Sequence, residues 1–496
     1  MRLTEYLVEN HDPQQLLLCL PAVFATSYST RILGVSTEQP LKPLWRLPFL
    51  YADPAYSLDK IRAYTDRSYV QKPGDVFIAE TGEYNKTRRD AEAIGNMEDY
   101  LEAYPEFVGA TYWYPRPQYI DECVEAIAQI AEMCESRGIE LIIAAPPMSA
   151  EALPAFRLED MQEFYSKVTE ISGFWNFIAS PISADPRFFY DRTHFRNNVG
   201  EMMMARMYGD ESIYIPEGFG TWVTQANVMA EIENTFTAEI PFEPENYTAR
   251  LPVLAYHDLT EESTKGTEIS ISRFREQMEA LKEAGYTPVS LEQILDYVLL
   301  GHDLPERPIL ITFDDGYVSN YTEAFPILQE YGYKATIFVI GVSFGKDTYK
   351  DTGEEITPHF GHEEALIMAQ SGLISIQSHS YDMHHAFQFD DPFRQGTLMM
   401  DGESEQDYLS LFRRDHKMMS DLLESYGDVV AFSYPYGRVS TIASILLREL
   451  GYQITFHGNP GVSTLIKGMP QSLLELRRYY MTEDISGERM IRIISQ

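Results

Sequence analysis

The sequence has few cysteines and no sign of a cysteine-based framework. Only three of its 496 residues are cysteines, Cys19, Cys123 and Cys134, and no two of them have C-x-x-C spacing. An odd number without paired spacing indicates neither a disulfide framework nor a cysteine zinc site. Cys123 and Cys134 lie eleven positions apart, about three helical turns, so we expect both in the core of a helical layer.

Long apolar segments are also missing. An apolar stretch near the N-terminus runs from Leu16 to Ala25 and is interrupted by Pro21, which makes it too short to span a bilayer. It follows acidic residues rather than a basic run, so it does not resemble a secretion signal. We therefore expect no integral membrane segment. The sequence leaves the localisation and the oligomeric state open.

Basic side chains are scarce as well. Lys plus Arg number 39 against 75 Asp plus Glu, which gives a net charge of -36. Such an excess repels nucleic acid phosphates and anionic membrane surfaces, so we expect no nucleic acid partner. The expected partner is a neutral or cationic molecule or a metal ion, although acidity can also serve solubility alone.

The length of the chain predicts two domains, because it exceeds one ordinary hydrophobic core. We predict a first domain at residues 1–209 and a second domain at 251–496. The intervening segment, 210–250, mixes Pro, Gly and acidic residues without a sustained period, and we interpret it as a linker.

Both domains have the alternating pattern of α/β proteins. In the first, a periodic helix at 118–137 precedes a buried strand at 139–145. In the second, the candidate strands are 252–255, 309–313, 335–340, 374–377, 429–433 and 453–456. The candidate helices between them are 272–284, 290–300, 322–331 and 404–426. This order predicts a parallel sheet or barrel, in which chemistry collects at the C-terminal ends of the strands.

Acidic and histidine side chains follow two of these strands. Asp314 and Asp315 follow the strand at 309–313. Two adjacent carboxylates at a strand end point different ways, so one can ligate a metal while the other acts as a base. His379 and His384 lie five positions apart in a later loop and can close on one cation. One Asp and two His would leave an open metal position for water.

A third strand, 429–433, ends in a tight Tyr-Pro-Tyr-Gly turn that contains Tyr436. Backbone N–H groups in such a turn could face an oxyanion. Each motif alone has a plainer explanation, since Asp-Asp-Gly and Pro-Tyr-Gly are common turn sequences and paired loop histidines are often solvated. Their joint occurrence at strand ends favours a catalytic site.

The blocks VLAYHDL, ITFDDGY, SHSYDMH and SYPYG, in this order, resemble the polysaccharide deacetylase family, the NodB-homology carbohydrate esterases, over about half of the chain. The resemblance implies a distorted (β/α) barrel and a divalent metal, zinc above all. It implies removal of N-acetyl groups from an N-acetylated polysaccharide: poly-N-acetylglucosamine, peptidoglycan or a chitin-like polymer. By this likeness Asp314 is the general base, Asp315, His379 and His384 are the metal ligands, and the Tyr436 backbone is the oxyanion donor.

The chain departs from this family pattern in three places. Many members space the two histidines four apart, and the five-residue spacing here resembles the branch that acts on poly-N-acetylglucosamine. Many also carry an arginine that orients the catalytic Asp at the position of Ser433, so Arg477 and Arg478 could either orient the site or form surface ion pairs. The family's late general acid has one candidate, His457. His257 is expected at the barrel mouth in a substrate-binding or supporting role.

Near the end of the first region stands the block FYDRTHF. Its Asp191 and His194, with Phe195 and Gly200, resemble the last block of SGNH hydrolases, where such a pair completes a Ser-His-Asp triad. The family's Gly-Asp-Ser block is missing, and the nearest match is Ser36. We therefore predict an SGNH-like, flavodoxin-like layered domain that is incomplete or inactive. The alternatives are an Asp191 that only caps a helix and an active O-acyl esterase.

Three functions follow for the whole chain. The first is a metal-dependent polysaccharide N-deacetylase, the second a non-catalytic glycan-binding protein built from degenerate hydrolase domains, and the third an SGNH-type O-acyl esterase. Acetate release with and without a chelator separates the first two, and an Asp191→Ala variant tests the third.

Overall fold

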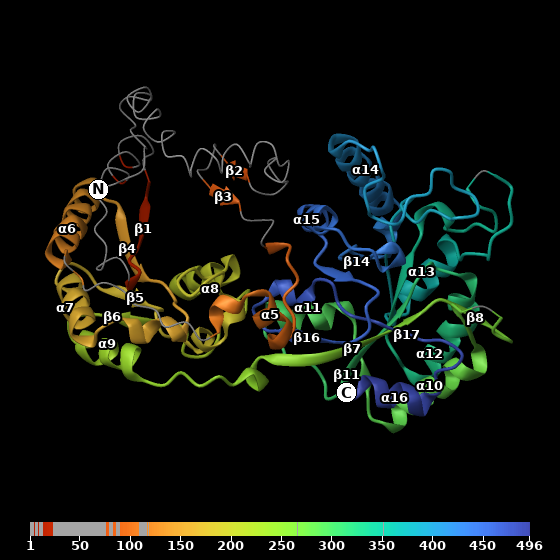
Figure 1. The fold of residues 1–496 in the computed structure, drawn as a ribbon, viewed down its shortest axis with the longest axis horizontal. Coiled ribbons are helices and arrows are strands. Elements are labelled where there is room, and N and C mark those ends of the chain that lie inside the picture. Colours follow the sequence, from red (N-terminus) through yellow and green to blue (C-terminus); the bar gives the residue numbers. More distant parts are fainter. Residues whose placement is uncertain are drawn as a thin grey trace. The chain divides into compact units, whose positions relative to one another are not determined.

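The chain forms two compact units in a computed structural model (Figure 1). The structure describes Thr4, Val8 and residues 13–22, 76–78, 83–85, 90–108, 117, 119–264, 266–350 and 352–496. The first unit contains β1 (Gln15–Cys19) with Leu101–Glu211 and Ile215–Glu243, and the second contains Ser212–Tyr214 and Pro244–Gln496 together with 90–100.

The first unit is a four-stranded sheet with helices on both sides. The strand order is β1-β4-β5-β6, in which β4 pairs in parallel with β1 and β5, and β6 is antiparallel to β5. In Figure 1, α6, α7 and α9 lie on one side of the sheet and α8 lies on the other. The bounds are β4 (Glu140–Ala145), β5 (Phe174–Asn176), β6 (Thr221–Val223), α6 (Ile120–Arg137), α7 (Leu158–Thr169), α8 (Asn197–Tyr208) and α9 (Val228–Thr237).

Helix α6 and strand β4 show why secondary structure in this unit could be predicted from the sequence. Cys123, Ile127 and Cys134 are buried on one face of α6, as the spacing of the two cysteines predicted, and both cysteines are free thiols. Gly138 ends the helix in the left-handed conformation, with φ 69°, which glycine adopts without steric cost. The predicted helix at 118–137 and strand at 139–145 are therefore confirmed, each within two residues.

The segment at 210–250, which we expected to be a linker, is largely folded. It contains β6, which pairs with β5, and α9, whose Val228 and Ile232 are buried in the core of the first unit. The boundary between the units accordingly falls after α9, at Glu243–Pro244. A three-residue strand and two buried residues among acids, Pro and Gly are too weak a pattern to detect without the sheet that they complete.

The second unit is a nine-stranded, mainly parallel sheet. The order is β15-β14-β13-β12-β11-β7-β16, with β10 beside β11 and β17 beside β7, and β16 is antiparallel to β7. The strands are β7 (Thr248–Tyr256), β10 (Thr287–Pro288), β11 (Pro308–Phe313), β12 (Ala335–Val339), β13 (Ile374–Ser378), β14 (Ala431–Ser433), β15 (Ile454–Phe456), β16 (Val462–Ile466) and β17 (Tyr479–Tyr480). All six predicted strands are present.

Helices surround this sheet in Figure 1. They are α10 (Ile271–Glu283), α11 (Leu291–Leu299), α12 (Phe325–Tyr331), α13 (His362–Gln370), α14 (Glu405–Leu423), α15 (Thr441–Glu449) and α16 (Gly487–Ile494). The remaining described elements are β2 (Val76–Ile78) paired with β3 (Glu83–Asn85), β8 (Asp258–Thr260) paired with β9 (Glu268–Ser270), and α5 (Met97–Ala103). Within the described part of the chain, every helix is too short or too polar to cross a membrane.

The last segment of the chain curls the sheet. Leu476 forms a parallel bridge with Phe456 at the end of β15, and β17 then pairs with β7. The segment 476–480 thus lies between strands that are distant in the sheet order. The structure shows a curled, mainly parallel half-barrel sheet, which is a coarser form of the expected distorted barrel.

Strand β11 lies in the middle of this sheet and is buried along its length. Ile309, Leu310, Ile311 and Phe313 are all fully buried, as in parallel sheets that are covered on both faces. Thr312 donates from its hydroxyl to the Leu254 carbonyl of β7, at 2.7 Å. Burial and hydrogen bonding therefore fix the end of β11, from which Asp314 and Asp315 follow.

Candidate metal and catalytic site

Three side chains from the ends of β11 and β13 converge on one point. The ligand atoms of Asp315, His379 and His384 all lie within 4.8 Å of one another. Asp315 Oδ1 lies 3.6 Å from His379 Nε2 and 3.7 Å from His384 Nε2. The structure thus brings together the three residues that the sequence resemblance implied as metal ligands.

The chemistry of these residues fits a divalent cation. Asp315 Oδ1 is buried and has no hydrogen-bond partner among the described residues, which is costly unless a positive charge satisfies it. His379 Nδ1 lies 2.7 Å from the Ser433 carbonyl oxygen. A carbonyl can only accept, so Nδ1 carries the proton and the Nε2 lone pair faces Asp315. Two imidazoles and one carboxylate suit zinc and related metals.

The backbone after β11 separates the two adjacent carboxylates. Asp315 has φ 73° and Gly316 has φ 82°, a left-handed turn that costs strain at Asp315 and little at glycine. A Cβ on Gly316 would lie 2.8 Å from Val339 Cγ1, so the site also needs a residue without a side chain. The turn directs Asp315 to the histidines and Asp314 to a different partner.

That partner is Arg478. Its Nη1 and Nη2 donate to Asp314 Oδ1 and Oδ2 at 2.7 and 2.8 Å, and Nη2 also donates to Ser433 Oγ at 3.0 Å. Burial opposes ionisation of Asp314. The Arg478 charge and its hydrogen bonds, together with the charges of His379 and His257, offset burial and hold the pKa of this carboxyl well below its usual value. Asp314 is therefore an ionised carboxylate beside the metal site.

Arg478 supplies the guanidinium that the family pattern led us to expect near position 433. It is fully buried in the 476–480 segment, with its guanidinium over the rings of Phe456 and Tyr480 at 6.0 and 5.6 Å. Arg477 instead forms an exposed ion pair with Asp99, at 2.8 Å. Of the two roles that the sequence left open, Arg478 therefore orients the site and Arg477 forms a surface ion pair.

Two histidines were candidates for further roles, and the structure places them differently. His257 follows β7, its carbonyl accepts from Asn320 Nδ2 at 2.8 Å, and its ring stacks on Tyr480 with centroids 5.8 Å apart. Burial raises the pKa of Asp315, and His384 and then His257 lower it. His257 therefore lies within electrostatic reach of the metal site.

His457 follows β15, and its carbonyl accepts from Arg478 Nε at 3.4 Å. Its Nδ1 accepts from the Asn459 N–H at 3.0 Å. Burial, followed by Arg477 and Arg478, lowers the pKa of His457 to about 4. Within the described part of the chain, its ring makes no hydrogen bond or ion pair with Asp314, Asp315 or the metal-site histidines. Its role as general acid stays a prediction from the sequence.

Tyr436 lies beside the metal site in a strained turn. Its φ of 58° places it in the left-handed region, and its ring lies against His384 with centroids 4.4 Å apart. Its hydroxyl donates to the His385 carbonyl. No described residue accepts from its backbone N–H, so this group is available to a ligand. The structure thus keeps the predicted oxyanion donor next to the predicted metal ligands.

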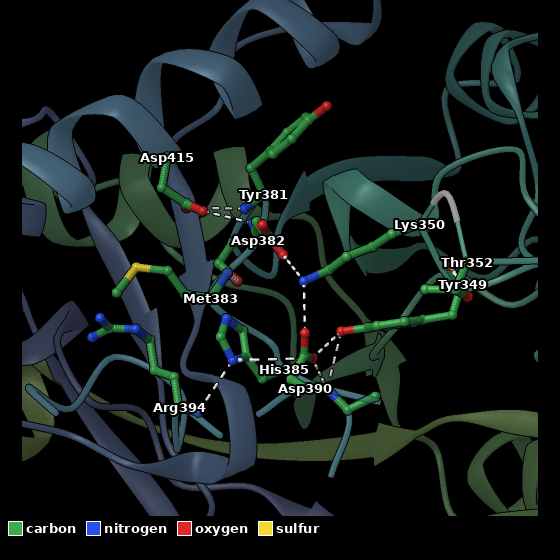
Figure 2. A network of polar contacts seen from close by, with 12 residues as sticks. Tyr349, Lys350, Thr352, Tyr381, Asp382, Met383, His385, Asp390, Arg394 and Asp415 are labelled. Carbon is green, nitrogen blue, oxygen red and sulfur yellow. Dashed lines mark hydrogen bonds and ion pairs between the residues drawn. The ribbon is translucent and has the colours of Figure 1, made fainter. Parts of the chain in front are cut away.

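One contributor to the site escaped the sequence analysis. Asp415 of α14 is buried and accepts from the backbone N–H groups of Tyr381 and Asp382, at 2.9 and 2.6 Å (Figure 2). It thereby holds the loop that carries both histidine ligands. The available signal was an acid within the apolar stripe of α14, which consists of Tyr408, Phe412, Asp415, Met419 and Leu423.

The first unit contains a second Asp–His pair. His194 Nδ1 lies 2.8 Å from Asp191 Oδ2, and Asp191 also accepts from the Thr193 and His194 N–H groups. The side chains of His194 and Asp191 are 70% and 45% exposed. Ser36, the weak nucleophile candidate, lies outside the described residues.

Known proteins match this chain over about half of its length. The sequence profile of the polysaccharide deacetylase family matches residues 301–455. YxkH of Bacillus subtilis, named as a polysaccharide deacetylase, is 30% identical over 239 residues, which are 48% of this chain and 74% of that protein. The Escherichia coli poly-β-1,6-N-acetyl-D-glucosamine N-deacetylase is 30% identical over 247 residues, which are 46% of this chain and 36% of that protein.

A solved structure gives a similar coverage. IcaB from Ammonifex degensii is 25% identical, covers 50% of this chain and 97% of its own, and has a TM-score of 0.42. The profile match includes Asp314, Asp315, His379, His384 and Tyr436. With this match and a relative aligned over 74% of its length, the chain belongs to the polysaccharide deacetylase family, and its second unit carries the deacetylase domain with an Asp–His–His candidate metal site.

Proposed function

We propose that this chain hydrolyses N-acetyl groups of a poly-N-acetylglucosamine-type polymer and releases acetate. The observation that carries the proposal is the cluster of Asp315, His379 and His384 within 4.8 Å, beside the separate, ion-paired carboxylate of Asp314. The name of the Escherichia coli relative supports the choice of polymer. Peptidoglycan and chitin oligomers are the competing substrates for the assay.

The proposed cofactor is a divalent metal, zinc first, held by Asp315, His379 and His384. When bound, it supplies Lewis acidity that polarises the acetyl carbonyl and lowers the pKa of a water. Ser433 fixes the His379 ring through its carbonyl, and Asp415 holds the loop between the two histidines. These supports keep both imidazoles in place before the substrate arrives.

Asp314 is the proposed general base. Its carboxylate accepts the proton of the attacking water, and the bidentate Arg478 pair keeps it ionised and oriented. As the water oxygen bonds to the acetyl carbon, the carbonyl oxygen becomes an oxyanion. The Tyr436 N–H, which has no acceptor among the described residues, donates to that oxyanion.

His257 is the better-supported candidate for the general acid. It follows β7, and its charge lowers the pKa of both Asp314 and Asp315, whereas His457 Nδ1 accepts from the Asn459 N–H and its ring pairs with neither carboxylate among the described contacts. In the proposed step, His257 gives a proton to the sugar nitrogen while the carbon–nitrogen bond breaks. Acetate and a free amine leave.

The test is acetate release from β-1,6-linked N-acetylglucosamine oligomers, with and without a chelator. We expect activity that the chelator abolishes and added zinc restores, and activity that Asp314→Asn removes. If the protein binds the oligomers yet releases no acetate with any added divalent metal, it is a glycan-binding protein and the enzymatic proposal is wrong. Parallel assays with peptidoglycan and chitin oligomers rank the substrates.

A second candidate function concerns the first unit. The 2.8 Å contact between His194 and Asp191 has the geometry of the acid–histidine half of a hydrolase triad. We propose that the first unit cleaves O-acyl esters in the manner of SGNH hydrolases. Ester hydrolysis that persists with chelator and disappears in Asp191→Ala would support it, and unchanged hydrolysis in that variant would remove it.

A further inference from the structure

Aromatic rings form a continuous path from the metal site to the surface. The His384 ring contacts Tyr436, Tyr436 lies 5.9 Å from Phe393, and Phe393 lies 5.7 Å from Phe387, centroid to centroid. Phe387 is 80% exposed, the highest value among the large apolar residues that are exposed in the described chain. A water-exposed ring is common by itself, but a row of rings that adjoins a reaction site marks a binding surface.

The loop that carries these rings is fastened at its start. Asp390 accepts from the Ala386 N–H at 2.7 Å, from Lys350 Nζ at 2.9 Å and from the Tyr349 hydroxyl. Figure 2 shows Lys350 between Asp390 and Asp382, which it also contacts at 2.8 Å. The segment that carries Phe387 and Phe393 is therefore tied to the segment that carries the histidine ligands.

The same loop is fastened at its end. The Arg394 N–H donates to His385 Nδ1 at 3.1 Å, and the buried Arg394 guanidinium pairs with Glu403 at 2.6 Å. Phe387 and Phe393 lie between these anchors, so little conformational entropy is lost when a ligand covers them. The polar network explains why the loop holds its shape although Phe387 faces water and Phe393 is only half-buried.

We propose that Phe387 and Phe393 form a sugar subsite, here called the aromatic ledge, for units of the amino-sugar polymer next to the reacting unit. This inference rests on the proposed function. A pyranose ring presents a face of C–H groups that packs against an aromatic ring, and a polymer must extend beyond the unit whose acetyl group reacts. The ledge begins at Tyr436, beside the metal ligand His384, so it lies on a path that the neighbouring units can follow.

The test compares substrates of different length in the full chain. In Phe387→Ala, we expect KM for the β-1,6-linked N-acetylglucosamine hexamer to rise about three- to ten-fold, the loss of one aromatic stacking contact. The kcat for the hexamer should stay at the wild-type value, and KM for the dimer, which offers at most one neighbouring unit to the ledge, should rise less than KM for the hexamer. Phe387→Tyr should restore the hexamer KM. Phe242→Ala, which removes a 46%-exposed ring from the first unit, is the matched control.

Calorimetric binding of the hexamer separates this inference from the proposed function. If wild-type protein releases no acetate, the deacetylase proposal fails, while weaker hexamer binding by Phe387→Ala still supports the aromatic ledge. Equal hexamer binding and equal KM in wild type and Phe387→Ala overturn the ledge. It is also overturned if the wild type forms a dimer that Phe387→Ala abolishes, since a second copy would then cover the ring.

Discussion

Each unit of this protein contains an Asp–His arrangement, and the two arrangements differ in how they are made. Asp191 and His194 share one turn, three residues apart, and are exposed to water. Asp315 and His379 follow β11 and β13, which β12 separates in the sheet; they are 64 positions apart in the chain, and both are buried. The exposed pair has the shorter contact, 2.8 Å against 3.6 Å. Proximity alone therefore does not distinguish a functional site.

What distinguishes the second site is burial together with charges from distant segments. Asp314 and Arg478 are 164 positions apart and pair at 2.7 Å with almost no exposure. In a buried site of low effective dielectric, such a pair fixes ionisation states and orientations that water would otherwise screen. A turn such as that of Asp191 forms its hydrogen bonds locally and constrains little beyond itself.

The largest expected effect is the loss of the general base. Asp314→Asn keeps the shape of the side chain but cannot accept the water proton, so we expect kcat for acetate release to fall about 10²- to 10⁴-fold. Asp191→Asn is the matched change in the other unit and should leave this rate unchanged. Steady-state acetate release measures both. A comparable loss in Asp191→Asn would contradict the separation of the two sites.

Removal of the buried arginine comes next. Arg478→Met leaves the Asp314 charge buried without a partner, and we expect the free energy of unfolding to drop by about 3–5 kcal/mol. The control is the neighbouring variant Arg477→Met, which breaks an exposed ion pair. It should change the free energy of unfolding by at most about 1 kcal/mol. Urea denaturation measures both variants. Equal effects would mean that the Asp314–Arg478 pair contributes no more than a surface contact.

The two histidine candidates for the general acid give a third comparison. We expect His257→Gln to lower kcat about 10²-fold with little change in KM. His457→Gln, which removes a ring held by the Asn459 N–H, should lower kcat far less. If the order of the two effects is reversed, the assignment from the sequence holds and the structural argument for His257 is wrong.

His457 should nevertheless contribute to the pH dependence of stability. Its pKa is about 4 in the folded protein against an ordinary 6.5, so between these values the unfolded chain binds the proton more readily. Its contribution to stability is complete above about pH 6.5 and is lost as the pH falls toward 4. Between pH 7 and pH 5, the free energy of unfolding of the wild type should fall. After allowance for partial solvent access, we expect that of His457→Gln to fall by about 1 kcal/mol less. Urea denaturation at both pH values would refute this if the variant and the wild type lose stability equally.

The smallest effect is expected at the exposed pair. His194→Ala removes a largely solvated contact, so the free energy of unfolding should change by no more than about 0.5 kcal/mol. Thermal or urea denaturation of the two proteins side by side gives the value. A loss above 2 kcal/mol would show that the pair is structurally coupled to the first unit.

The sequence by itself predicted, in their order, six of the nine strands in the sheet of the second unit and four of the helices α10 to α16, as well as the identity of its metal-site candidates. Buried parallel strands such as β11 are continuous apolar runs, and the residues that follow them are adjacent in the chain, so both can be recognised locally. Asp315, His379 and His384 could be named for this reason. The antiparallel β16 and the folded part of 210–250 could not be found, because their apolar residues are few and depend on partners elsewhere.

Only the tertiary structure decided how Asp314 is oriented, how the histidine loop is held and which rings continue toward the surface. Arg478 reaches Asp314 because the last segment lies between β15 and β7, and Asp415 reaches the histidine loop from a helix. These contacts join positions that are 34 and 164 residues apart. No local pattern encodes them, since they arise from the curl of the sheet and from burial that strengthens each charge.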